Sequence, residues 1–284
     1  MKKILVIFSV LMIAVISIYG DIFKTSDRIY SLKLNYENGM IKIINHTLRF
    51  GDSSSNTTFD YVTQGGQEIL FPFERFSAEF KIGERNNIIF LYQPLTIETT
   101  VPLKDQITID DTVFTTDGND TLNIKYGFPF WRVSYVYDFL SNEKFNLGAG
   151  LSLQLRNASI VFKKENGEIA VVNQNLGPVP IIKIKARMNI NDDLYIETDS
   201  DGFYATSKWF NGADFNFSGS IWDISVKGGI YINKWTETFI NIRYLGGSAS
   251  GVSQYGNTAW SQGNTASTEN YLGSFILSLG FTIK

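Results

Sequence analysis

The sequence of 284 residues contains no cysteine and one histidine, His46. Without cysteine there is no disulfide framework, no thiolate metal ligand and no residue to carry a lipid after an export signal. One histidine is a poor basis for a zinc or haem site, so we expect no cofactor and no metal. Acidic and basic residues are interspersed and nearly balance, with a net charge of −3, so no basic stripe indicates a nucleic-acid partner.

Long apolar runs are also absent, except at the N-terminus. Two lysines precede the uncharged apolar run 4–19, and Gly20 offers a small residue before the first carboxylate. This layout predicts a signal peptide over residues 1–20, because the run is shorter than the roughly 20 residues that cross a bilayer as a helix. Ile18, three positions before the expected cleavage point, is unfavourable there, so an uncleaved anchor remains the alternative.

The rest of the chain shows an alternation of polar and apolar residues. In residues 145–156, Phe, Leu and Ala alternate with Asn, Gly, Ser, Gln and Arg. A period of two indicates a strand, and about a dozen residues suit a tilted membrane strand better than a shorter globular one. The same pattern recurs in residues 75–82, 182–190, 222–232 and 277–283.

The connections between these segments alternate in length. Short turns rich in Asn, Asp, Gly or Ser are predicted at residues 83–87, 141–144, 191–193 and 233–234. Long polar stretches occupy residues 51–67, 104–120, 163–176, 207–212 and 246–268. The alternation predicts about ten strands, with both ends of the chain on the short-turn side. Eight and twelve strands remain alternatives.

These features resemble the bacterial outer-membrane β-barrel class, in which short periplasmic turns alternate with longer external loops. The resemblance covers nearly all of the chain after residue 20, but it is architectural and no specific family motif accompanies it. It implies an all-β fold, a single antiparallel up-and-down transmembrane barrel. It also implies location in the outer membrane, with membrane lipid and the barrel-assembly machinery as partners. The chain ends in Lys284 rather than in the terminal aromatic residue of that class, although Phe281 lies on the apolar face.

Two segments interrupt the pattern. Residues 37–39 read Glu-Asn-Gly, a hairpin-like turn. We therefore expect residues 21–39 to form a periplasmic segment or an extra short strand, and residues 40–284 to form the barrel. Around Pro129 the apolar positions switch from even to odd numbers. A bulge at Pro129 would explain the switch, because one extra residue exchanges the faces of a strand.

Charged residues on the polar faces are predicted to point into the lumen. Across the turn at residues 191–193, three bases should face acids on the next strand: Lys183, Lys185 and Arg187 opposite Glu197, Asp199 and Asp201. The predicted lumen charge network comprises Arg132, Asp138, Arg156, Lys183, Lys185, Arg187, Glu197, Asp199, Asp223, Lys227, Glu237 and Arg243. A ten-stranded lumen is little wider than its side chains, so these residues favour a plug of ion pairs. A narrow charge-lined pore is the alternative.

Motifs for catalysis are scarce. His46 precedes Thr47 and matches none of the motifs of omptin proteases, lipid A deacylases or phospholipases, the enzymes known in the barrel class. We interpret it as a rim or lumen residue. The glycine-rich residues 246–251 lack the Gly-Lys-Ser/Thr of a phosphate loop and are interpreted as an external loop. The acidic pair 110–111 and residues 119–121 lack an EF-hand register and are interpreted as solvated loops.

The sequence therefore predicts a non-enzymatic outer-membrane barrel that is structural and surface-exposed, or a narrow pore. Its external loops would meet the environment or host surface molecules, or its lumen would pass small solutes. Two alternatives from other classes remain. One is a barrel enzyme that acts on lipid or peptide at the outer rim, and the other is a soluble secreted β-barrel carrier.

Overall fold

The computed structural model describes residues 30–51, 56–109, 112–116, 121–156, 158–164, 169–174, 179–209, 217–252 and 267–284. They form seventeen strands and a short 3-10 helix, η1 (Ser207–Trp209). In this part of the chain, no helix is long and apolar enough to cross a bilayer. The predicted signal peptide lies outside the described residues.

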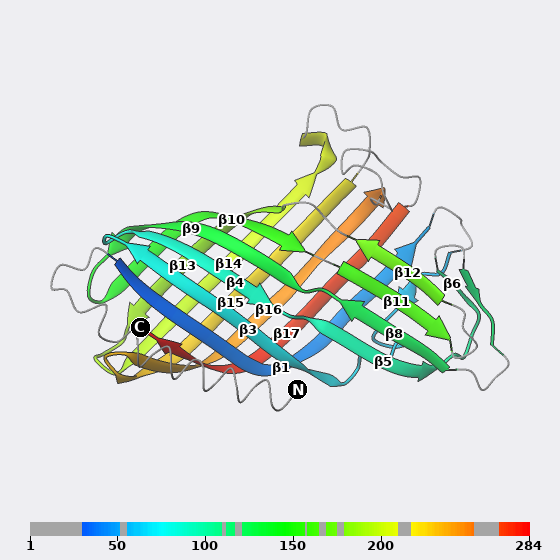
Figure 1. Cartoon of the computed structure of the whole chain (residues 1–284), viewed down its shortest axis with the longest axis horizontal. Helices are drawn as coiled ribbons and strands as arrows, with labels where there is room; N and C mark the ends of the chain where they lie inside the picture. The colour runs from blue at the N-terminus through cyan, green and yellow to red at the C-terminus, as the bar shows by residue number, and fades with distance from the viewer. Residues whose placement is uncertain are drawn as a thin grey trace.

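Ten strands close into an antiparallel barrel, because the last strand of the ring pairs with the first (Figure 1). Closure leaves no edge in the ring, so its backbone groups are paired without water. The predicted fold class and strand number are confirmed. In ring order the strands are β1 (Tyr30–Phe50), β3 (Leu70–Ile82), β4 (Asn86–Gln93), β9 (Phe130–Ser141), β10 (Phe145–Arg156), β13 (Val179–Asn189), β14 (Leu194–Thr206), β15 (Phe217–Asn233), β16 (Thr236–Val252) and β17 (Ser267–Ile283).

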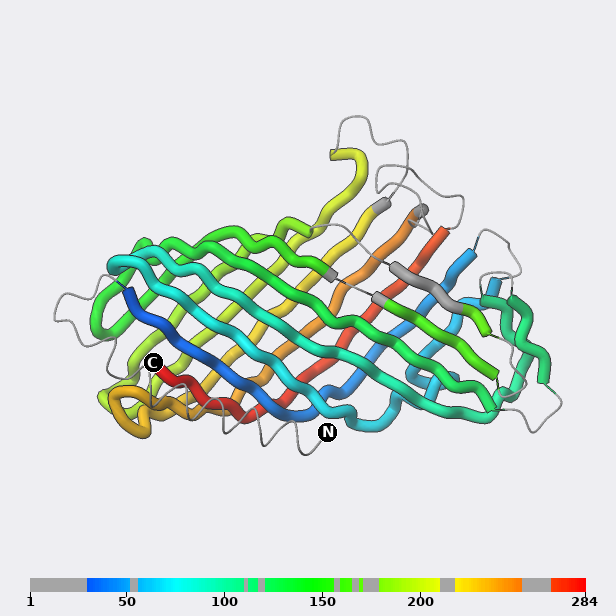
Figure 2. Tube along the Cα trace, viewed as in Figure 1, coloured from blue at the N-terminus to red at the C-terminus, as the bar shows by residue number. Residues whose placement is uncertain are grey.

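Four short turns connect the strands at one end of the barrel, as predicted from the sequence. In three of them an asparagine side chain accepts hydrogen bonds from the backbone N–H groups of residues two or three positions later in the chain. Oδ1 of Asn142 accepts from Lys144 and Phe145 at 3.0 and 2.8 Å, and Asn191 and Asn233 act in the same way. The C-terminus and the start of β1 lie at this same end (Figure 2).

The first barrel strand begins earlier than predicted. β1 runs without interruption through residues 37–39, where Glu37 pairs with Arg75 of β3 on one side and with Gly280 of β17 on the other. A Cβ on Gly39 would lie 2.1 Å from the backbone oxygen of Leu277, so the glycine permits close approach of β17. The predicted turn is therefore wrong, and residues 30–39 belong to the barrel instead of preceding it.

Beyond the other end of the barrel, four strands continue into a second sheet (Figure 1). Its order is β12 (Ile169–Gln174), β11 (Ala158–Lys164), β8 (Thr121–Gly127) and β5 (Thr96–Pro102). Prolines at positions 94 and 129 separate β4 from β5 and β8 from β9, because proline has no N–H for a ladder. The short strands β2 (Phe59–Asp60), β6 (Ile107–Ile109) and β7 (Thr112–Phe114) pack with this second sheet. Together they form what we call the outer cap, residues 56–69, 95–128 and 158–174 where described.

The apolar side of the sheet changes from the outward to the inward face at the boundary between barrel and cap. On β9, Trp131 and Tyr135 point outward and are half-exposed, whereas on β8 Leu122 and Ile124 are buried inside. The switch of the apolar positions at Pro129 is confirmed, but the bulge proposed to explain it is wrong, because even-numbered residues point inward on both β8 and β9. Apolar side chains on the outward face indicate that this face contacts lipid. Where the apolar side chains point inward instead, the outward face contacts water.

Outward apolar side chains form a continuous band around the barrel, which we call the membrane-facing belt. Leu151 and Leu279 are 67% and 65% exposed, values that would be unfavourable for leucine in water. The belt is defined by Phe90, Val133, Leu151, Ile184, Ile196, Val226, Ile242, Leu277 and Leu279. Its position on strands of every part of the ring fits a barrel surrounded by hydrocarbon.

Four of the predicted loops are partly strands, among them 51–67, which contains β2, and 104–120, which contains β6 and β7. β16 continues to Val252, so the glycine-rich residues 246–251 form part of the barrel wall instead of an external loop. A Cβ on Gly247 would lie 2.3 Å from the backbone oxygen of Ser220. A glycine is therefore needed at this position so that β15 and β16 can pack closely. Likewise β12 falls within the predicted loop 163–176. The acidic residues 110–111 and most of the loop 246–268 lie outside the described residues.

Candidate functional site

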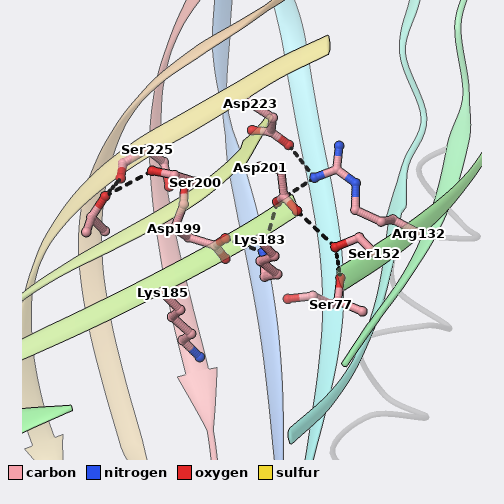
Figure 3. A network of polar contacts seen from close by, with 12 residues as sticks. Ser77, Arg132, Ser152, Lys183, Lys185, Asp199, Ser200, Asp201, Asp223 and Ser225 are labelled. Carbon is pink, nitrogen blue, oxygen red and sulfur yellow. Dashed lines mark hydrogen bonds and ion pairs between the residues drawn. The ribbon is translucent and has the colours of Figure 1, made fainter. Parts of the chain in front are cut away.

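The lumen is filled by charged side chains that extend inward from strands on all sides of the ring. Alternation puts them there, because successive side chains of a strand point to opposite faces; Arg132, for example, lies between the outward Trp131 and Val133. Figure 3 shows the centre of this arrangement, where side chains from β9, β10, β13, β14 and β15 meet. We call the whole set the lumen network.

Asp223 of β15 is the hub of the network. Its carboxylate is fully buried and accepts from Nη1 of Arg75 at 3.0 Å and from Nη1 of Arg132 at 2.9 Å. Arg243 forms a third ion pair with it. The three guanidinium groups come from β3, β9 and β16, so one carboxylate connects separate parts of the wall. Arg243 also pairs with Glu37 of β1 at 3.3 Å.

Asp201 of β14 forms a second centre beside the hub (Figure 3). It pairs with Nη1 of Arg132 at 2.6 Å and with Nζ of Lys183 at 2.9 Å, and the Ser152 hydroxyl donates to it at 3.0 Å. Gln154 accepts from the remaining side of the same guanidinium group at 2.7 and 3.0 Å. These buried charges are thus both paired and hydrogen-bonded, the condition under which burial of charge is tolerated.

A further group of ion pairs lies toward the short-turn end. Glu79 pairs with Lys33 at 3.4 Å and with Lys185, and Glu197 pairs with Lys227 at 3.3 Å. The remaining pairs of this group are Arg187 with Glu197 and Glu237, Lys284 with Glu237, and Lys81 with Asp138. Between these side chains a cavity of about 20 Å³ remains. That volume holds about one water molecule.

The sequence-predicted lumen residues can now be placed. The register sets Lys183 opposite Asp201, Lys185 opposite Asp199 and Arg187 opposite Glu197, the facing arrangement expected across the turn. The structure brings the following predicted residues into the lumen network: Arg132, Asp138, Lys183, Lys185, Arg187, Glu197, Asp199, Asp223, Lys227, Glu237 and Arg243. The side chain of Arg156 lies outside the described part.

Several members of the network were not predicted. Arg75, Glu79 and Lys81 lie on the polar side of a strand that the alternation identified, so the same signal could have found them. Glu37 was missed because it was assigned to a turn, and Lys33 because it precedes that turn. No group of three His, Cys, Asp or Glu residues suited to a metal ion occurs among the described residues.

Toward the outer end the lumen becomes apolar. Ile41 and Ile43 of β1 are fully buried and pack in one cluster with Phe71, Leu245 and Ile276 from other strands. The cluster continues into the outer cap, where Ile109 and Phe114 of the β6 and β7 hairpin are also fully buried. The described lumen is therefore filled by ion pairs in its inner half and by apolar side chains in its outer half.

His46 lies on β1 beyond the bulge between Ile43 and Asn45 and outside the membrane-facing belt. Its ring stacks on Tyr61 with centroids 3.9 Å apart and meets the Tyr126 ring edge-on at 4.3 Å. Nδ1 donates to Oε1 of Gln67 across 2.7 Å. Burial lowers the pKa of His46 to about 4, although the hydrogen bond with Gln67 opposes this shift. The ring is neutral and joins the barrel wall to the cap.

The closed ring and the membrane-facing belt decide the architecture. The fold is that of an outer-membrane β-barrel. No protein family and no curated protein matches the sequence. Among solved structures, the outer membrane protease OmpT from Escherichia coli is 12% identical with a TM-score of 0.47, covering 91% of this chain and 99% of that one.

Two further structures extend the comparison. Ail, the attachment invasion locus protein of Yersinia pestis, is 8% identical with a TM-score of 0.34, covering 89% of this chain and 99% of that one. The outer membrane protein OprG from Pseudomonas aeruginosa is 7% identical with a TM-score of 0.34, covering 88% and 95%. At these identities and TM-scores the similarities carry no argument about activity.

Proposed function

We propose that this protein is a non-enzymatic, non-conducting barrel of the bacterial outer membrane that holds a folded cap at the cell surface. The observation that carries the proposal is the hub at Asp223, where three guanidinium groups from different strands meet in the centre of the lumen. A filled lumen favours a structural role over the alternative of a narrow pore for small solutes.

The outer cap supports the surface role. It continues the barrel wall beyond the belt, and its buried faces carry apolar residues such as Ile97, Leu122 and Phe162. A segment with its own apolar core outside the membrane is a stable platform for contacts with external molecules. Outer-membrane lipid is the partner proposed for the belt, and the assembly machinery is the partner proposed during insertion.

The position of His46 supports the non-enzymatic part of the proposal. The imidazole is fully buried, and its neighbours are two tyrosines and a glutamine. A general base must reach the proton it removes from a substrate, and a ring enclosed in this way has no such access. We therefore assign to the outer end of the protein a role in surface contacts and not in catalysis.

Conductance in a planar lipid bilayer tests the proposal. The wild-type protein should insert without discrete current steps, because the ion pairs and the apolar cluster close the lumen. A double variant, Arg132→Ala with Asp223→Ala, removes one charge of each sign from the plug but leaves the apolar cluster in place, so it should also insert without steps. Steps from the wild-type protein at physiological salt would contradict the proposal and favour the narrow pore.

A further inference from the structure

Two polar side chains interrupt the membrane-facing belt on the neighbouring strands β1 and β3 (Figure 1). Asn38 of β1 is exposed and follows Glu37, which is buried in the lumen. Glu74 of β3 is half-buried and lies between Phe73 and Arg75, both of which point inward. Asn38 and Glu74 are therefore outward residues, and the register sets them directly opposite each other.

Apolar side chains surround this pair. Across the ladder with β17, the neighbour of the asparagine is the exposed Leu279 of the belt. Toward the outer end follow Met40 of β1 and Leu70 of β3, both at least half-exposed. Toward the inner end the rings of Tyr36 and Phe76 pack together, with centroids 4.9 Å apart. The pair thus lies within the apolar surface and not at its edge.

The carboxylate of Glu74 lacks a counter-charge on this surface. Outward hydroxyls elsewhere in the belt are satisfied within the wall, as where Thr198 donates to the carbonyl of Ser225 at 2.9 Å. Glu74 accepts from the Tyr36 hydroxyl at 3.2 Å, but no base of the described residues pairs with it. Lys42, an outward base on the same two strands, donates instead to a backbone carbonyl. A charge on the lipid face is unfavourable unless a partner meets it.

The pair is complementary to itself. Two copies inserted in the same direction can be related by a two-fold axis along the membrane normal, and the same surface of each copy then forms the contact. An axis that passes between β1 and β3 brings Asn38 of each copy opposite Glu74 of the other. Each amide can then donate to the carboxylate of the other copy, so the same hydrogen bond forms twice.

We propose that the protein forms a two-fold dimer through the outward faces of β1 and β3, with the reciprocal contact of Asn38 and Glu74 at its centre. Hydrogen bonds to an ionised group are strong, and the absence of water around them increases their strength. Met40 and the rings of Tyr36 and Phe76 flank the polar centre and pack against the other copy. Hydrocarbon chains have no donor to offer the carboxylate, whereas a second copy provides one.

Cross-linking in lipid vesicles tests the dimer. The chain has no cysteine, so Met40→Cys supplies a single thiol beside the proposed axis, and Ile184→Cys supplies one on β13 in another part of the belt. A short bismaleimide should link Met40→Cys into dimers at lipid-to-protein ratios at which Ile184→Cys stays monomeric. Equal cross-linking of the two variants at every ratio would mean random collision and would overturn the proposal.

A charge swap in the Met40→Cys chain tests the reciprocal contact. Asn38→Glu sets carboxylates opposite each other and should lower the association constant at least about tenfold, because two hydrogen bonds to charged groups are lost. Adding Glu74→Asn restores an amide opposite each carboxylate and should restore the dimer. Thr198→Leu on β14, outside the contact, should leave cross-linking unchanged. A swap that cross-links no better than Asn38→Glu alone overturns the proposal.

Heat-modifiable gel migration shows which variants are folded. If Asn38→Glu does not fold, Asn38→Leu replaces it, since leucine suits a lipid-facing position, and this variant should also lose the cross-link. Native mass spectrometry that finds monomers with a bound phospholipid, and no dimers, would assign the pair to a lipid headgroup and overturn the proposal. Conductance plays no part in these measurements, so their outcome is independent of the proposed function.

Discussion

At the scale of single residues, the stability of the barrel depends on how completely each buried charge is matched. Asp223 pairs with three arginines at once. Arg132 and Arg243 each have a second carboxylate partner, whereas Arg75 pairs with no other carboxylate among the described residues. Removing one partner of a buried pair leaves an uncompensated charge and costs about 3–5 kcal/mol. Exposed pairs contribute less than about 1 kcal/mol, because water and salt screen them.

We therefore expect Asp223→Asn to lower the free energy of unfolding by about 3–5 kcal/mol. The control is Glu98→Gln, which breaks the 3.0 Å pair with Lys125 on the exposed face of the cap. That change should cost less than about 1 kcal/mol. Urea titration of the refolded protein, followed by tryptophan fluorescence and by heat-modifiable gel migration, measures both. Equal effects of the two substitutions would show that the hub is not needed for stability.

His46 gives the cap a dependence on pH. The pKa of about 4 in the folded cap lies below the ordinary value near 6.5, so the opened cap binds protons more readily. The attachment should be at full strength above pH 6.5 and weaken as the pH falls toward 4. The protection factor of the Tyr61 amide, which donates to the His46 carbonyl at 2.9 Å, should fall over that range once the observed exchange is divided by the intrinsic rate at each pH. His46→Gln should abolish this pH dependence, and its persistence in the variant would assign it to another group.

At the scale of secondary-structure elements, the break at the two prolines divides each of the strands β4 and β9 from its continuation in the cap. Below the break the outward side chains belong to the membrane-facing belt, and above it they are polar residues such as Thr100 and Asn123. The same outward position therefore faces hydrocarbon in one sheet and water in the other.

An arginine introduced at an outward position should consequently destabilise the barrel but have little effect on the cap. Leu151→Arg places a charge in the middle of the belt and should cost about 2–4 kcal/mol of folding free energy in lipid vesicles. Thr100→Arg places the same side chain on the exposed face of the cap and should be nearly neutral. Folding yields in vesicles measure the difference. A neutral Leu151→Arg would mean that this face does not contact lipid.

Much of this arrangement could be predicted from the sequence, because strands with a lipid face and a lumen face must alternate. Residues 145–156 were predicted with the bounds that β10 has, and the four short turns follow from their asparagines and glycines. The lumen charges on β13 and β14 followed from the same alternation.

The errors came from glycine and from contacts distant in sequence. Gly39 and Gly247 read as turn and loop residues, but in the structure each permits a neighbouring strand to approach closely. Local sequence does not distinguish these two uses of glycine. The hub at Asp223 and the enclosure of His46 depend on which strands become neighbours across the lumen, and a single sequence with a period of two contains no information on that.

At the scale of the whole molecule, we propose that the barrel has its short turns on the inner side of the outer membrane and its cap on the outer side. The inner half of the lumen is filled by charge and the outer half by apolar residues. In this proposed orientation the cap would extend the wall into the surroundings of the cell. Everything proposed for function depends on this orientation.

The absence of cysteine makes a direct test of orientation possible, since any introduced cysteine is the only thiol. Thr100→Cys in the cap and Glu143→Cys in a short turn, each in the otherwise unchanged chain, are treated on intact cells with a membrane-impermeant maleimide. The account predicts labelling of Thr100→Cys on intact cells, and labelling of Glu143→Cys only after the outer membrane is permeabilised. Labelling of Glu143→Cys on intact cells, or protection of Thr100→Cys, would contradict it.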